Sequence, residues 1–176
     1  MKRALCALLL CACGPGGNTL GMGGRYLSDA TFDADGTSTS FSTGGNPSVS
    51  SYKSHTDETL SMTIESGYDS DAVLTEGTCA LKLMGSGSAL VLKDTTTCPT
   101  TTTNSATAGG ATSSTTDVST ITWKAFRVEP GSSNGRVRIT GSGQLTGSSK
   151  QDAKLKSQYD LSFKLDAQAT RVATEK

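Results

Sequence analysis

The sequence predicts an all-β protein, an antiparallel meander that forms a β-sandwich or a small β-barrel with long polar loops. Composition is the first indication, because the chain has 20 glycines, only 5% aromatic residues and many Ser and Thr residues, which favours strands and turns over a helical bundle. The second is strict alternation of apolar and polar residues in several segments, the period of a half-buried strand. The third is a set of glycine-containing turns that join these segments as hairpins.

Two segments near the N-terminus alternate in this way. The first, residues 25–33, is expected to be a strand with Tyr26, Ala30 and Phe32 on one face. A polar stretch, residues 34–58, follows and is expected to be a loop. The next strand is expected from Thr59 to Ser66, and its apolar face consists of Leu60, Met62 and Ile64.

Three turns can be tested by register, because residues that face each other across an antiparallel hairpin have a constant index sum. Turns centred on residues 85–88, 130–135 and 141–143 each place apolar residues opposite apolar residues. The expected pairs are Leu83 with Leu90, Leu81 with Leu92, Val128 with Val137, Phe126 with Ile139, and Ile139 with Leu145. An antiparallel meander is therefore expected over residues 118–147.

The C-terminal segment, residues 155–169, shows the strongest alternation in the chain. Every second residue is apolar or small: Leu155, Ser157, Tyr159, Leu161, Phe163, Leu165, Ala167 and Ala169. At about 3.3 Å per residue such a strand approaches 50 Å. It is therefore expected to bend between two sheets or to coil along a barrel.

The N-terminus has the pattern of an export signal, with Lys2 and Arg3 before an apolar run too short to span a bilayer. It resembles the signal of bacterial lipoproteins, whose motif is Leu, two small residues and a cysteine that receives a diacylglyceryl group. Leu10, Ala12 and Cys13 match this motif, whereas Cys11 departs from the usual Ala or Ser. An ordinary secretory signal cleaved near Ala12 or Gly17 is the alternative.

The resemblance implies three parts: a signal peptide (1–12), a lipidated Gly-rich tether (13–24) and a single β domain (25–176). It also implies a lipid on Cys13 and a place in the bacterial cell envelope, most simply at the outer membrane. The Cys-bounded hairpin, the Gly-Ser-Gly turns and the long last strand resemble small exported lipoproteins of soil δ-proteobacteria. This second resemblance implies no activity.

Cys79 and Cys98 remain in the folded domain once Cys6 and Cys11 leave with the signal. An even pair in an exported chain predicts one structural disulfide. The hairpin register places Asp94 opposite Cys79, so the bridge is not expected to be a simple cross-strand rung. The low-complexity segment 99–117 is expected to be a surface loop.

Charge and chemistry-bearing residues exclude several function classes. The 16 basic and 16 acidic residues balance and leave no basic stripe for nucleic acid. His55 is the single histidine and is expected in a solvated loop, without a serine motif that would make it a catalytic base. Calcium is the least implausible metal, through Asp33-Ala34-Asp35-Gly36 or Asp69-Ser70-Asp71, but the EF-hand spacing is incomplete and both runs are expected to be turns. No metal, no cofactor and no catalytic residue is therefore expected.

Two functions are left open. The first is a non-enzymatic envelope lipoprotein with a structural or partner-binding β module, whose contact surface is formed by loops 34–58 and 99–117. The second is a lipocalin-like carrier of an apolar ligand. One set of side chains would fill a solid core in the first case and line a cavity in the second: Leu60, Met62, Ile64, Leu81, Leu83, Phe126, Ile139, Tyr159, Leu161 and Phe163.

Overall fold

The computed structural model describes residues 19–65, 72–76, 79–108 and 110–172. In this part of the chain nine antiparallel strands form one sheet, and no residue is helical. The strands are β1 (Gly24–Ser40), β2 (Ser48–Glu65), β3 (Ala72–Glu76), β4 (Cys79–Ser86), β5 (Ala89–Leu92), β6 (Thr96–Ala108), β7 (Ala111–Pro130), β8 (Arg136–Gln151) and β9 (Lys154–Arg171). The predicted all-β antiparallel meander is confirmed.

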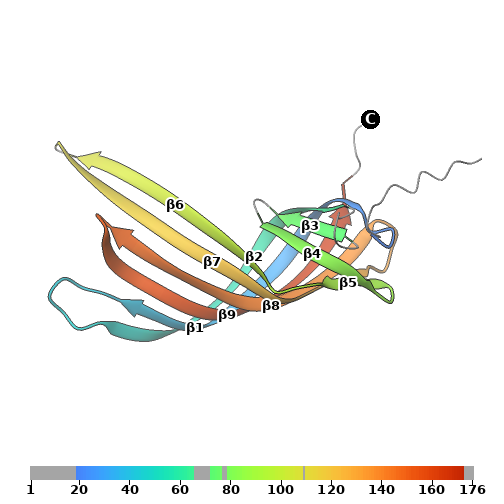
Figure 1. The fold of residues 1–176 in the computed structure, drawn as a ribbon, viewed down its shortest axis with the longest axis horizontal. Helices are drawn as coiled ribbons and strands as arrows, with labels where there is room; N and C mark the ends of the chain where they lie inside the picture. Colours follow the sequence, from blue (N-terminus) through green and yellow to red (C-terminus); the bar gives the residue numbers. More distant parts are fainter. Residues whose placement is uncertain (1–18, 66–71, 77–78, 109, 173–176) are drawn as a thin grey trace, which may run out of the picture.

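The sheet closes on itself at one end only. Its strand order is β5-β4-β3-β2-β1-β9-β8-β7-β6, and β5 also pairs with β7 through Leu90 and Val128. We call this closed end the ring. Beyond it, three long hairpins continue as an open sheet of six neighbouring strands, which extends to the left in Figure 1. We call this part the wing; it comprises residues 36–40, 48–52, 96–108, 111–121, 145–151 and 154–161.

The apolar core fills the ring. Tyr26, Ile64, Leu83, Val128 and Phe163 are fully buried there. The predicted inward-facing set is confirmed, with Leu60 and Tyr159 partly buried against the core and the other members buried. A void between Leu60, Leu81, Trp123 and Leu165 in the ring core measures about 10 Å³, room for one water molecule at most.

A β-bulge marks the boundary between ring and wing on β7. Trp123 lies opposite Gly143 and Ala125 opposite Ser142, so Lys124 is the extra residue. Because two residues point outward at the bulge, Trp123 and Phe126 can both face the interior. Their rings meet edge to face, with centroids 5.1 Å apart.

The predicted turn at residues 141–143 is wrong, since this segment lies inside the continuous strand β8. Its glycines make room for aromatic rings. A Cβ atom on Gly141 would lie 2.6 Å from Cζ3 of Trp123, and one on Gly143 would lie 2.9 Å from the Phe163 ring. The meander over residues 118–147 therefore has one turn fewer than expected.

The other two predicted hairpins exist, but each register is shifted by two residues. Leu83 lies opposite Leu92 instead of Leu90, and Val128 lies opposite Ile139 instead of Val137. The first turn contains only residues 87 and 88, with Gly87 at a φ of 63°, a tight hairpin turn of the kind that glycine favours. A shift of two keeps each side chain on its predicted face.

The predicted loops 34–58 and 99–117 are also wrong, because most of both segments belongs to paired strands. β1 continues to Ser40 and β2 begins at Ser48, so the Asp33–Gly36 run is extended strand instead of a turn. β6 and β7 form a Thr-rich hairpin across 99–117. The predicted strands 25–33 and 155–169 lie within β1 and β9, and the predicted strand Thr59–Ser66 lies within β2 up to Glu65, its last residue being outside the described residues.

The N-terminal end of the described chain packs against the ring. Met22 is buried there, and the Tyr26 hydroxyl donates a hydrogen bond of 2.9 Å to its carbonyl oxygen. Arg171 donates from Nη2 to the carbonyl oxygen of Gly21 at 2.7 Å. Residues 19–23 of the expected tether are thus part of the folded unit, at the end of the molecule opposite the wing tips (Figure 1).

Candidate binding surfaces

Cys79 and Cys98 form the predicted disulfide, with their Cα atoms 5.4 Å apart. The bridge joins β4 to β6, which do not pair with each other. It is therefore not a cross-strand rung, as expected, although the predicted position of Asp94 opposite Cys79 is wrong because β5 ends at Leu92. The bridge lies where β5 ends and the sheet opens into the wing. It therefore holds β4 and β6 together at the edge of the ring.

Cys13, the predicted lipidation site, lies outside the described residues, as do the expected signal peptide and the Asp69-Ser70-Asp71 run. Within the described residues, no helix is long and apolar enough to cross a membrane.

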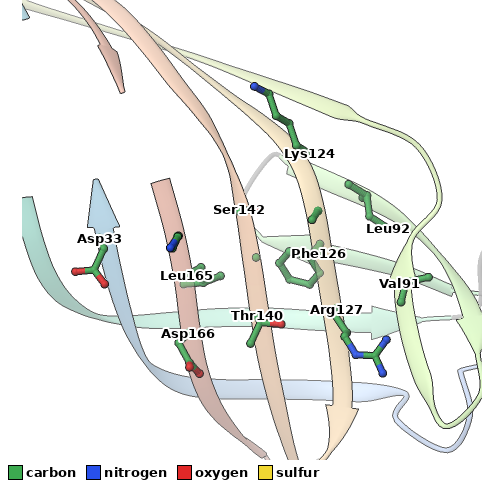
Figure 2. Close-up of a pocket in the computed structure, with 13 residues that line it drawn as sticks. Asp33, Val91, Leu92, Lys124, Phe126, Arg127, Thr140, Ser142, Leu165 and Asp166 are labelled. Carbon is green, nitrogen blue, oxygen red and sulfur yellow. The ribbon is translucent and has the colours of Figure 1, made fainter. Parts of the chain in front are cut away.

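A broad groove lies on the outer face where the ring widens into the wing (Figure 2). Strands β1, β5, β7, β8 and β9 contribute its lining, and its volume is about 690 Å³. A second hollow of about 810 Å³ continues toward β2 and shares Asp33, Lys124, Ser142 and Lys164 with the first. The bulge explains the position of Lys124, because it turns this extra residue outward into the groove.

Most charges around this groove neutralise each other in pairs. Arg138 donates to Asp166 at 2.7 Å, and this hydrogen bond holds the pKa of the Asp166 carboxyl below its usual range. Lys53 Nζ lies 3.5 Å from an Asp35 carboxylate oxygen. These exposed pairs each contribute little to stability, and Lys124 and Lys164 also line both hollows.

His55 lies on strand β2, not in the predicted loop, and it is exposed as expected. Its Nδ1 atom is 2.7 Å from Oδ1 of Asp33, and this hydrogen bond raises the pKa of the imidazole. Its Nε2 atom lies 4.0 Å from Oδ1 of Asp57. Among the described residues, its partners are thus carboxylates and no serine, so the structure assembles no serine nucleophile with this base.

The carboxylates proposed for calcium do not converge. Asp33 and Asp35 are exposed on β1, and each faces a basic side chain of β2. Within the described residues, no three His, Cys, Asp or Glu side chains group closely enough to hold a metal ion.

The inner face of the wing offers a surface of different chemistry. Strand register aligns its side chains in rows that continue the ring interior outward. The row nearest the ring is apolar and consists of Tyr52, Gly36, Leu161, Leu145, Ile121 and Cys98. The next two rows are mostly hydroxyl-bearing: Ser50, Ser38, Tyr159, Gly147, Ser119 and Thr100, then Ser48, Ser40, Ser157, Ser149, Asp117 and Thr102. Asp117 is the single carboxylate among these residues.

Two tyrosines stand out from these rows. Tyr52 is 42% exposed. Tyr159 is half-buried because its ring covers Gly147, where any Cβ atom would overlap it. Burial raises the pKa of the Tyr159 hydroxyl, while a hydrogen bond with Ser119 opposes that rise. Both rings belong to one face, with β1 between their strands.

The sequence pattern predicted Tyr159 on the inner face but missed Tyr52 and the Ser and Thr rows. In these strands both faces are polar, so the alternation of apolar and polar residues that identifies a half-buried strand is absent. The chain matches no known protein family model, and no curated protein matches it.

Proposed function

We propose that this protein is a non-enzymatic lipoprotein of the bacterial envelope that uses the inner face of its wing to bind a hydroxyl-rich envelope polymer. The proposal rests on the direction in which the strands run from the N-terminal end of the domain. β1 begins in the ring at Gly24 and ends at the wing tip at Ser40. A lipid on Cys13 would hold the ring near the membrane and direct the wing away from it.

The reach of the wing fits this role. The edge strand β6 has 13 residues, Thr96–Ala108, which at about 3.3 Å each gives a length of about 40 Å. A diacylated cysteine supplies about 0.8 kcal/mol per buried methylene group, enough for stable attachment. The anchored protein would thus present a sheet surface well clear of the lipid headgroups.

The chemistry of the inner face favours a neutral polar partner. Tyr52 and Tyr159 supply flat apolar rings with a polar tip, and the Ser and Thr rows supply hydroxyls that donate and accept hydrogen bonds. Tyrosine and serine are the residues that adaptable binding surfaces use most. Sugar rings present both C–H faces and hydroxyls, so a polysaccharide strand matches this surface.

The filled ring interior favours this proposal over a lipocalin-like carrier. A ligand site for an apolar molecule is typically about 300–1,000 Å³ in volume. The void between Leu60, Leu81, Trp123 and Leu165 in the ring core is about 10 Å³. Phe163 and Trp123, which a carrier would need to move aside, pack edge to face at 4.9 Å.

The anchor is tested by intact-mass analysis of protein from the membrane fraction. We expect cleavage before Cys13 with added acyl mass, and a Cys13→Ser variant that stays unprocessed or soluble. Wild-type chains free in the periplasm with an N-terminus beyond Gly17 would contradict the anchor.

The binding surface is tested by co-sedimentation of the Cys13→Ser protein with purified peptidoglycan sacculi, the probe chosen for envelope glycan. We expect the wild-type wing to bind and the Tyr52→Ala/Tyr159→Ala double variant to bind at least about tenfold more weakly, a loss of about 1.4 kcal/mol or more. Thr39→Ala on the outer face serves as the control. Absence of binding, or equal binding by all variants, would refute the proposed partner.

A further inference from the structure

The two edges of the wing differ in a way that points to strand addition at one of them. β2 and β6 are the edge strands, since each pairs with a single neighbour over its wing segment. Unpaired backbone groups on an edge are a template for another strand, and proteins block such edges with charged residues. β2 carries Lys53, His55, Asp57 and Glu58 along the part that pairs only with β1. β6 has no charged residue at all.

Pro99 shows which backbone groups of β6 face outward. Proline has no N–H, so within a ladder it occupies positions whose N–H side faces solvent. Pro99 lies opposite Thr120 in the β6–β7 pairing. The odd-numbered residues of β6 therefore direct their N–H and C=O groups away from β7.

Side-chain contacts between β6 and β7 agree with this assignment. The Oγ1 atoms of Thr103 and Thr116 lie 3.4 Å apart, and those of Thr107 and Thr112 lie 3.0 Å apart. Opposed side chains approach most closely in the non-hydrogen-bonded pairs of an antiparallel ladder, and both contacts involve odd-numbered residues of β6. Residues 99–107 are exposed.

We infer that a second copy of this chain pairs with β6, antiparallel and about a two-fold axis at Asn104. Pro99 limits the pairing at one end, and the end of β6 at Ala108 limits it at the other. This register places Thr101 opposite Thr107 and Thr103 opposite Ser105 of the other copy. About eight backbone hydrogen bonds form between the copies, and two six-stranded wings join into one continuous sheet.

A second copy fits this edge because two uncharged β6 strands can pair without electrostatic repulsion. Neither strand of the pair carries a charge, so no like charges meet across the two-fold axis. β6 already forms one antiparallel ladder of mainly Thr and Ser residues, with β7. Pairing of β6 with the β2 edge of another copy would be head to tail and open-ended, and would place the charges of β2 against a strand without counter-charges. This inference does not depend on the lipid anchor or on the polymer proposed above.

The test is sedimentation velocity of the purified full chain from about 1 to 500 µM, the range in which a small interface associates. We expect a reversible monomer–dimer equilibrium. Thr103→Pro removes an outward N–H without breaking the β6–β7 ladder and should weaken the dimer at least about tenfold. Thr103→Lys should weaken it in low salt and less in high salt, since added ions screen the repulsion.

Thr103→Val, which keeps the N–H and the branched side chain, is the matched control and should dimerise as the wild type does. Circular dichroism and an intact Cys79–Cys98 bridge verify folding of each variant. A wild type that is monomeric at all concentrations would overturn the inference, as would a dimer unaffected by Thr103→Pro. Larger open-ended species that disappear on substitution of β2 would show head-to-tail pairing instead.

Discussion

Gly141, Gly143 and Gly147 lie on β8, and a Cβ atom at each of them would meet an aromatic side chain. They alternate with outward residues along β8, so all three open space on the inner face. Trp123, Phe163 and Tyr159 occupy that space. A single methyl group at these positions competes directly with the aromatic core, because packed interiors have no spare volume.

Gly141→Ala should therefore destabilise the protein although alanine is the better strand residue. The new Cβ atom would lie 2.6 Å from the Trp123 ring, and overpacking of this kind costs about 1–3 kcal/mol. Urea denaturation measures the loss. Ser142→Ala changes the adjacent outward side chain and should stay within about 0.5 kcal/mol of wild type; equal effects of the two substitutions would contradict the packing account.

A second prediction at this scale concerns His55. The hydrogen bond with Asp33 raises its pKa above the ordinary value of 6.5. Its contribution to stability is therefore fully present below pH 6.5 and is lost as the pH rises through the raised pKa. NMR titration should show a raised pKa in the wild type that falls toward 6.5 in Asp33→Asn. An unchanged pKa in that variant would exclude Asp33 as the cause.

At the scale of elements, the pattern predicted those strands that bury one face. β9 alternates through Leu161, Phe163 and Leu165, and its position and inner face were both predicted. β6 consists mainly of Thr and Ser on both faces, so neither periodicity nor burial distinguished it from a loop. The sequence predicts a turn at Gly-Ser-Gly in β8, because it shows the glycines but not the aromatic rings that they accommodate.

The disulfide also belongs to the scale of elements, because it links strands β4 and β6 where the ring opens into the wing. Its cysteines are 19 residues apart, and closing a loop of that size stabilises a chain by about 3 kcal/mol. Cys79→Ser and Cys98→Ser should lower stability equally, and the double variant should match each single one. Scanning calorimetry of thermal unfolding measures the loss of stability in each variant. A double variant markedly less stable than either single would show that the thiols act separately, as would two reactive free thiols in the exported protein.

At the scale of the whole molecule, the two ends of the fold differ in structure: one is a packed core and the other is an open sheet. The ring holds nearly all of the buried apolar side chains and is closed by β5, while the wing is one sheet thick and exposes both faces. Such an open sheet persists because its strands are the continuations of strands fixed in the ring. Because the ring interior is filled, the proposed binding surface lies on the wing.

Phe163→Ala tests the filled ring interior most directly. Phe163 is 2% exposed and contacts the rings of Phe32 and Trp123. If the ring is a solid core, the substitution should cost about 3–5 kcal/mol in the free energy of unfolding, and the folded wild type should not bind an apolar fluorescent probe. A small loss of stability, together with saturable micromolar probe binding that the substitution abolishes, would contradict the solid core and favour a carrier.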